Sequence, residues 1–486
     1  MIEIAVARNL KSLIKGARRV AVVGPKRIFT PKRFPRLMGK RLDDLAVALS
    51  KEANPGLLGS TATTLAGKDI HTLAVGVLPD EVSRHNSPSR AESIRRVVSE
   101  LPGGRGKTAI IVVLDDPSHI LAAMNAIGRA YPTFTRKTGS APKERVQVFA
   151  VDHDGRPIEI PDIAKLTMDT TRACAELVDT PPTDLNPEAY GERAHAMLAE
   201  LPNVEVEEIV GDDLLEHGLG GIHAVGRCAV KPPRMIVATY MPAEPSGTHI
   251  ALVGKGVVYD TGGLNLKVGG NMYTMKCDMG GSAAVLGAFC VLAQSACRHQ
   301  VTLILCIAEN AIGPNAYKPD DVLTMHSGKT VEINNTDAEG RLLLADGVSW
   351  ATHELGCDIV FDAATLTGAQ LISLGVLHAG ICCNDDALEA TVLAAGKSSG
   401  DLCHPLLFAP EFLKSEFRST IADMRNSVSN RMNAQTSCAG QFVYNHMEDS
   451  KARWCHVDLA GPAFPKDRGT GYGVALLSQA ILALEA

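Results

Sequence analysis

The sequence predicts an α/β protein of two domains, a smaller α/β amino-terminal domain and a larger second domain with a central mixed sheet flanked by helices. The chain has 486 residues, which is more than a single domain usually holds. Short apolar runs typical of strands alternate with longer helical patterns along the chain. A helical pattern that stops at Pro181 and Pro182 separates the two parts, because paired prolines end helices.

The amino-terminal part contains four apolar runs that we interpret as strands. They are RRVAVVG (18–24), HTLAVGVL (71–78), TAIIVVLDD (108–116) and RVQVFAVD (145–152). One clear helical pattern, SHILAAMNAIGRAY, lies among them, and a second, IAKLTMDTTRACAELVD, follows them. We therefore assign residues 1–165 to the amino-terminal domain and residues 166–185 to a linker helix.

The second part, residues 186–486, is richer in glycine and contains five further strand candidates. They are PRMIVATYM (233–241), HIALVGKGVVYD (249–260), VTLILCIAEN (301–310), KTVEI (329–333) and CDIVFDAATL (357–366). Three helical patterns lie between or after them, at 281–296, 340–355 and 439–449. Several strand candidates are nearly continuous apolar runs, as expected for central strands covered on both faces. In such sheets functional sites form at the carboxyl ends of the strands.

Charge and composition limit the possible partners. Aromatic residues make up only 4% of the chain and the net charge is −6, so no nucleic-acid partner is expected. Residues 1–41 differ, because they carry twelve Lys or Arg and one acid, Glu3, which leaves the remainder near −17. We interpret this segment as a basic face of a folded domain, with a mitochondrial targeting segment or an anionic-surface contact as alternatives. No run of about 18 apolar residues predicts a membrane span.

Several familiar motifs are missing. The twelve cysteines all lie at or after Cys174 without a C-x-x-C pair, which excludes a zinc ribbon and favours reduced thiols in a cytosol-like compartment. The stretch PGGRGKT (102–108) has Leu101 where a P-loop needs glycine, and a predicted strand follows it, so we interpret it as a turn. The chain contains neither H-E-x-x-H nor G-x-S-x-G.

Acidic and basic residues gather at three predicted junctions between strands and the following segments. Glycines lie beside them and would allow close backbone approach. The charged residues are Lys255, Asp260, Lys267, Asp278, Asp337, Glu339 and Arg341. Buried carboxylates need compensating cations. A paired divalent-metal site of a hydrolase is the favoured interpretation. A buried ion network and a phosphate or nucleotide site remain open as alternatives.

These segments resemble the leucyl (cytosol) aminopeptidases, a family of dinuclear metallopeptidases. NTDAEGRL (335–342) is the signature of that family and is intact here. VGKGVVYDTGG (253–263) and MKCDMGGSAAV (275–285) match its two other metal-ligand segments, although Thr261 stands where the family often has Ser. The resemblance covers roughly residues 170–480. It implies that residues 186–486 form a catalytic metallopeptidase domain.

The resemblance also implies a role for each charged residue. The metal ligands would be Lys255, Asp260, Asp278, Asp337 and Glu339. They would hold two divalent ions (Zn²⁺, Mn²⁺ or Mg²⁺) with a bridging water that attacks the peptide. Lys267 would stabilise the oxyanion, and Arg341 would hold a bicarbonate that acts as general base. Lys255 can bind metal only when deprotonated, and a neighbouring dication lowers its pKa.

An apolar pocket for the first side chain of the substrate would complete the site. Its residues would be Met275, Leu366, Gly368, Ala460 and Ala463. The implied activity is release of amino-terminal residues, with Leu and other apolar residues preferred, from short peptides. The resemblance further implies a homohexamer in the cytoplasm, with a mitochondrial location as alternative. A DNA-binding or structural role of the basic amino terminus, as some members of the family carry, is the alternative function.

Overall fold

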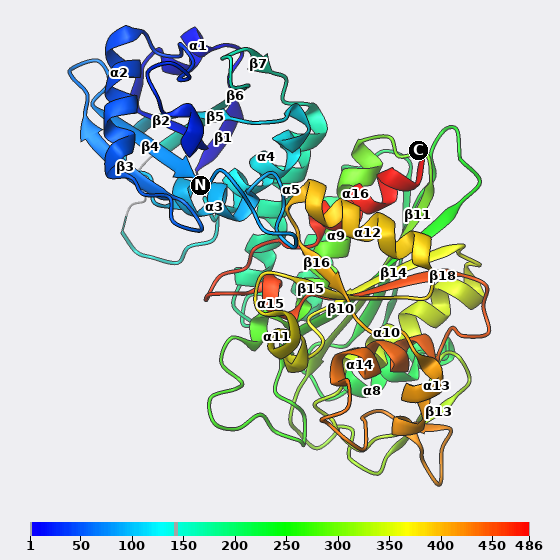
Figure 1. Cartoon of the computed structure of the whole chain (residues 1–486). Coiled ribbons are helices and arrows are strands. Elements are labelled where there is room, and N and C mark those ends of the chain that lie inside the picture. Colours follow the sequence, from blue (N-terminus) through cyan, green and yellow to red (C-terminus); the bar gives the residue numbers. More distant parts are fainter. Residues whose placement is uncertain (1, 140–143, 486) are drawn as a thin grey trace. The chain divides into compact units, whose positions relative to one another are not determined.

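The computed structural model describes residues 2–139 and 144–485, and it divides into two compact units (Figure 1). Unit 1 comprises Met1–Arg172 with Gly396–Leu402, and unit 2 comprises Ala173–Ala395 with Cys403–Ala486. A smaller α/β amino-terminal part and a larger part with a mixed sheet are confirmed. The domain limits assigned from the sequence stay a prediction, and Gly396–Leu402 was not expected in unit 1.

Unit 1 is a sheet of seven strands with helices. The path of the sheet is β1-β6-β5-β2-β4-β3, with β7 paired to β6, and all its pairs are parallel except β3 with β4 and β6 with β7. The strands are β1 (Glu3–Val6), β2 (Ala17–Pro25), β3 (Ser60–Leu65), β4 (Thr72–Leu78), β5 (Gly106–Val113), β6 (Glu144–Val151) and β7 (Pro157–Ile158). The helices are α1 (Leu10–Ile14), α2 (Lys40–Leu49), α3 (Ala91–Ser99), α4 (Ile120–Arg129) and most of α5 (Asp162–Asp179). The four predicted strands correspond to β2, β4, β5 and β6.

The basic segment at the start of the chain belongs to the folded part of unit 1. Its central strand β2 lies between β5 and β4 in the sheet. The guanidinium of Arg19 donates to Thr108 Oγ1 (2.9 Å) and lies 3.4 Å from Glu144. Arg27 lies 2.5 Å from an oxygen of Asp115. Part of the positive charge of this segment is therefore paired inside the unit.

Unit 2 is built on a mixed sheet of eight strands in the order β16-β15-β18-β14-β10-β11-β9-β8. The strands are β8 (Val204–Val210), β9 (Arg234–Tyr240), β10 (His249–Asp260), β11 (Gln300–Asn310), β14 (Ile359–Ala364), β15 (Ala379–Cys383), β16 (Cys403–Pro405) and β18 (Arg453–Asp458). A separate small sheet contains β12 (Val322–Thr324), β13 (Thr330–Glu332) and β17 (Met424–Arg425). The predicted strand KTVEI was therefore wrongly placed in the main sheet. It is short and pairs antiparallel with β12 close by in the chain.

Helices cover both faces of this sheet. Successive residues of β10 face α9 on one side of the sheet and α10 on the other. At Gly254 an added Cβ would lie 2.5 Å from Ser282 Cα of α9, whereas Val253 contacts Gly347 of α10 from the opposite face. Alternation along the strand thus also directs Lys255 toward α10. The helices are α6 (Pro187–Leu198), α7 (Asp213–Glu216), α8 (Gly220–Gly226), α9 (Gly280–Gln294), α10 (Gly340–Ser349), α11 (Gly368–Leu374), α12 (Asp386–Ser399), α13 (Pro410–Leu413), α14 (Gln435–Tyr444), α15 (Ala460–Ala463) and α16 (Val474–Leu482).

One helical span, Met275–Gln294, is long and apolar enough to cross a membrane by length and composition. It consists of the 3₁₀ turn η4 (Met275–Met279) and α9. Of its most apolar window, 94% is buried inside the protein. Such burial is typical of a core helix in a folded domain.

A buried carboxylate joins α8 to α10. Asp346 Oδ2 accepts hydrogen bonds from the backbone N–H groups of Gly221 (2.7 Å) and Ile222 (2.9 Å), and its Oδ1 accepts one from His326 N (3.0 Å). The acceptor thereby satisfies two free N–H groups in the first turn of α8. Burial raises the pKa of Asp346 to about 7, against the lowering effect of these hydrogen bonds.

Replacing Asp346 by Asn should change the pH dependence of stability. The pKa of Asp346 is raised in the folded state, so its contribution to stability is full below the unfolded pKa of about 4 and is lost as pH rises through about 7. The stability advantage of the parent over Asp346→Asn should therefore fall over this range, by up to about 1.4 kcal/mol per pH unit. Urea midpoints from pH 4.5 to 8 measure it. The exposed Asp116→Asn is the control, and a constant difference between parent and Asp346→Asn would contradict the prediction.

Candidate active site

The charged residues of the three junctions, apart from Arg341, come together beside the carboxyl end of β10 in unit 2. Lys255 lies within β10, and Asp260 is its last residue. Asp278 lies in η4, immediately before α9. Asp337 and Glu339 precede α10, which begins at Gly340. The signature segment thus delivers its two carboxylates from the turn that leads into a buried helix.

Lys255 is the centre of one half of this cluster. Its ammonium Nζ lies 2.7 Å from Asp278 Oδ1 and 3.0 Å from Glu339 Oε1, and it donates to the carbonyl of Thr365 (2.8 Å). Burial lowers the pKa of Lys255, but the nearby carboxylates outweigh burial and raise it. Without a metal, Lys255 is therefore held as an ammonium ion among acids.

Lys267 pairs with the acids in the other half of the cluster. Its Nζ lies 2.8 Å from Asp260 Oδ2 and 2.6 Å from Asp337 Oδ1. Burial lowers the pKa of Lys267, and Asp260 and Glu339 reverse that effect, so that the pKa is raised. Its side chain is 16% exposed, whereas that of Lys255 is 3% exposed. Of the two lysines, Lys267 is thus the more accessible to a molecule that enters the site.

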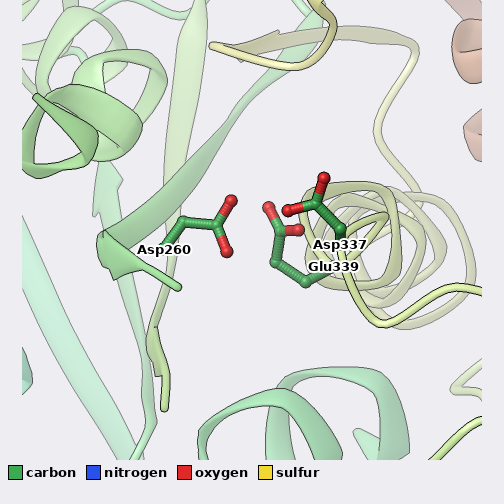
Figure 2. Close-up of side chains that lie close together, drawn as sticks. All are labelled: Asp260, Asp337 and Glu339. Atoms are coloured by element: carbon green, nitrogen blue, oxygen red, sulfur yellow. The ribbon is translucent and has the colours of Figure 1, made fainter. Parts of the chain in front are cut away.

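The carboxylates of Asp260, Asp337 and Glu339 point toward one another (Figure 2). One oxygen from each lies within 4.8 Å of one oxygen from the others, which is close enough to hold a common metal ion. Asp278 Oδ2 and Glu339 Oε2 are buried and have no hydrogen-bond partner. Buried polar atoms are almost always paired, so these two oxygens indicate ligands that bind here. Four carboxylates against two ammonium groups also leave an excess of negative charge, which fits divalent cations.

Arg341 lies in the first turn of α10 but pairs differently from the lysines. Its Nη1 donates to the carbonyl of Asn426 (2.9 Å), and its guanidinium lies 6.0 Å from the centre of the Phe442 ring. Its buried Nε has no partner. Burial lowers the pKa of Arg341 to about 10, which leaves it cationic at neutral pH. The residue therefore keeps a positive charge and a free donor for an anion.

The five residues predicted for the substrate pocket lie in or beside three elements. Met275 begins η4, Gly368 begins α11, and Ala460 and Ala463 bound α15, whereas Leu366 lies in the loop between β14 and α11. Asp458 connects two of them, since its Oδ1 accepts hydrogen bonds from the backbone N–H groups of Leu366 (3.1 Å) and Ala460 (3.2 Å). Ala463 packs against Gly280 at the start of α9.

Sequence reasoning did not select Thr365, Asp458 or Asn310. Thr365 Oγ1 donates to Asp278 Oδ1 (2.9 Å). Asn310 Nδ2 donates to Asp260 Oδ1 (2.8 Å). All three residues end a strand or follow one directly. Their position at predicted strand ends was the sequence feature that could have identified them.

The fold and this cluster define a two-domain α/β enzyme with a candidate metal centre. The chain belongs to the cytosol aminopeptidase family: the model of its catalytic domain matches residues 172–478, and that of M17 aminopeptidase N-terminal domain 2 matches residues 20–140. The predicted resemblance is confirmed. The protein is accordingly an aminopeptidase, a hydrolase of a metal-dependent family.

Similar proteins agree with this assignment. Probable aminopeptidase NPEPL1 of Homo sapiens is 45% identical over 413 residues, which cover 83% of this chain and 78% of that protein. The structure of leucyl aminopeptidase from Trypanosoma cruzi has a TM-score of 0.92 and 39% identity, with 99% of this chain and 97% of that chain covered. Leucyl aminopeptidase from Trypanosoma brucei in complex with bestatin gives 0.88 and 34%, with 99% and 95% covered.

Gly340 leaves the space that the side chain of Lys255 occupies. A Cβ at residue 340 would lie 2.4 Å from Lys255 Cε and 2.7 Å from its Nζ. Because Lys255 is held by several polar contacts, Gly340→Ala should displace it and lower aminopeptidase activity roughly 100-fold. Activity per folded protein is the measurement.

Gly347→Ala is the matched control on the same helix. Its Cβ would crowd Val253 and Cys306 instead of a charged residue. It should lower thermal stability and leave the activity of the folded fraction near the parent value. Equal activities of the two variants would contradict this account of Gly340.

Proposed function

We propose that this aminopeptidase uses two divalent metal ions to release amino-terminal apolar residues, Leu preferred, from short peptides. The observation that carries the proposal is the cluster of acids at the end of β10, of which Asp260, Asp278 and Glu339 are buried and Asp337 is partly exposed. Its carboxylates converge within ligand distance, and two of their oxygens are buried without a partner. An ion network alone would be expected to pair these oxygens.

The residues that would hold the ions are those around the two lysines. They are Lys255, Asp260, Asp278, Asp337 and Glu339. When bound, such ions supply Lewis acidity at the scissile carbonyl and lower the pKa of water. Lys255 would have to give up a proton to serve as a ligand, which requires a dication to overcome the raised pKa of its ammonium group. Zn²⁺, Mn²⁺ and Mg²⁺ all fit a donor set dominated by oxygen.

Lys267 would stabilise the negative charge that develops on the carbonyl oxygen of the substrate. Its ammonium is already positioned by Asp260 and Asp337 at 2.8 and 2.6 Å. The raised pKa keeps it protonated at neutral pH. A donor positioned before the reaction stabilises an oxyanion without a reorganisation cost.

Arg341 would bind a bicarbonate that accepts a proton from the attacking water. The carboxylates of the cluster are assigned to metal, so the general base has to come from another group. Arg341 has a buried donor without a partner and a cationic charge to hold such an anion. Guanidinium groups bind planar oxyanions well because two N–H groups can donate side by side.

The preference for apolar residues rests on the five candidate pocket residues. Met275 and Leu366 are apolar, and Gly368, Ala460 and Ala463 are small, so none of the five offers a charge to a substrate side chain. A homohexamer and a cytoplasmic location remain proposals from the family resemblance. A relative from Leifsonia xyli is named probable cytosol aminopeptidase.

Metal removal tests the proposal directly. Dialysis against a chelator should abolish hydrolysis of Leu-amide, because it removes the ions that would supply Lewis acidity and lower the pKa of water. Added Mn²⁺, Zn²⁺ or Mg²⁺ should restore it. Comparing Leu-amide with Glu-amide in the restored enzyme tests the apolar preference. Undiminished activity in protein shown by elemental analysis to be metal-free would refute the two-metal proposal.

Lys267→Met isolates the role of the oxyanion donor. The substitution removes the ammonium and keeps much of the side-chain volume, so kcat should fall roughly 10²–10³-fold. Steady-state kinetics on Leu-amide measure it. Lys329→Met is the matched control, since Lys329 forms a partly buried pair with Glu448 (2.8 Å) elsewhere in unit 2 and should keep parental kcat. A similar kcat for both variants would exclude this role for Lys267.

A further inference from the structure

Asn310 is a buried polar residue beside the acid cluster that none of the proposed steps uses. It is the last residue of β11 and lies in register with Asp260, the last residue of β10. Its Nδ2 donates to Asp260 Oδ1 (2.8 Å) and to the carbonyl of Thr336 (3.1 Å). Thr336 directly precedes Asp337, so one amide group contacts two of the segments that carry the candidate ligands.

The orientation of this amide is set by its neighbours. Both contacts are acceptors, so only the NH₂ side of the amide can face them, and the opposite rotamer would place an oxygen against two oxygens. Oδ1 is buried without a partner. Gly263 leaves room for it, since a Cβ there would lie 3.0 Å from Oδ1 and 2.9 Å from Thr336 Oγ1, and its φ of 63° favours glycine.

Further hydrogen bonds hold the backbone beside Asp260 and Thr336, the two residues that the Asn310 amide contacts. The backbone carbonyl of Asn310 accepts hydrogen bonds from Thr261 N (3.2 Å) and Thr261 Oγ1 (2.7 Å). The carbonyl of Thr336 also accepts from Tyr317 OH (2.7 Å), and Thr336 N donates to Asn265 Oδ1 (2.7 Å). The loop after β10 and the turn before α10 are therefore tied together through Asn310 and Thr336.

The two oxygens of Asp260 have different partners. Oδ2 lies 2.8 Å from Lys267 Nζ, and Oδ1 accepts hydrogen bonds from Asn310 Nδ2 (2.8 Å) and from the backbone N–H of Gly262 (2.8 Å). An amide orients a carboxylate without neutralising it, whereas a lysine or arginine at residue 310 would cancel one negative charge of the cluster. A neutral donor thus preserves the charge that attracts dications and still fixes the carboxylate plane.

We propose that Asn310 is a positioning residue of the metal centre, one that fixes Asp260 and the turn containing Asp337 at the spacing needed for metal binding. The inference rests on the proposed metal site. Groups that orient metal ligands typically contribute 10- to 100-fold to affinity. Asn310 acts through Asp260 and Thr336, so its effect should appear in metal affinity itself and not only in the rate of hydrolysis.

Mn²⁺ binding to metal-free protein tests this inference. Isothermal titration with Mn²⁺ alone should show affinity roughly 10- to 100-fold weaker in Asn310→Ala than in the parent. Circular dichroism and the melting temperature of the metal-free variant verify the fold. Asn125→Ala is the matched control, because Asn125 Nδ2 donates to Asp401 Oδ1 (3.2 Å) and the Ser399 carbonyl (3.5 Å) inside unit 1. It should bind Mn²⁺ like the parent.

The outcomes separate this inference from the proposed function. If the parent itself fails to bind Mn²⁺, Zn²⁺ or Mg²⁺, the proposed metal site is refuted, and the proposed role of Asn310 is refuted as well. If the parent binds Mn²⁺ and folded Asn310→Ala binds it within about threefold, only the positioning role is overturned. Should Asn310→Ala not fold, Asn310→Leu replaces it, since it keeps much of the side-chain volume and removes the Nδ2 donor to Asp260 and Thr336. Weakening beyond about threefold supports the proposal, and unchanged affinity overturns it.

Discussion

The attraction between carboxylates and lysines at the end of β10 holds together the strand–helix junctions that form the site. Four acids, three of them buried and Asp337 partly exposed, cannot lie together unless positive charge accompanies them. In this structure Lys255 and Lys267 supply it, each between two acids at 2.6–3.0 Å. The acids come from separate elements, so the cluster ties β10, η4 and the turn before α10 to one another. The same charges that order the fold would select divalent ions.

Close backbone approach makes this cluster possible. A Cβ at Gly281 would lie 2.1 Å from the carbonyl oxygen of Ala363, and one at Gly262 would lie 2.8 Å from Asp337 Oδ1. Gly340 admits the side chain of Lys255 in the same way. The glycines of the three sequence segments therefore have a common purpose: they bring helix α9, helix α10 and the loop after β10 near enough for short charged side chains to meet.

Sequence patterns predicted what depends on local periodicity and on unusual residue types. Continuous apolar runs identified β10, β11 and β14, and charged residues beside glycine at strand ends identified the cluster. Long-range contacts were beyond such patterns. Asp401 joins unit 1 through a 2.6 Å ion pair with Arg129 and a hydrogen bond from Asn125, residues more than 270 positions earlier. Asn310 was missed because a single asparagine at a strand end has many uses, and only its two acceptors reveal this one.

Arg341 is the third cationic residue of the site, and unlike Lys255 and Lys267 it does not pair with the acids. Among the described residues no carboxylate lies within ion-pair distance of it, whereas each lysine lies between two acids. Its contacts are a backbone carbonyl and an aromatic face, neither of which cancels its charge. A guanidinium buried in this way is stabilised when an anion arrives. The site thus combines an anionic cluster suited to metal ions with a cationic group suited to a small oxyanion, and their separation prevents Arg341 from neutralising the acids.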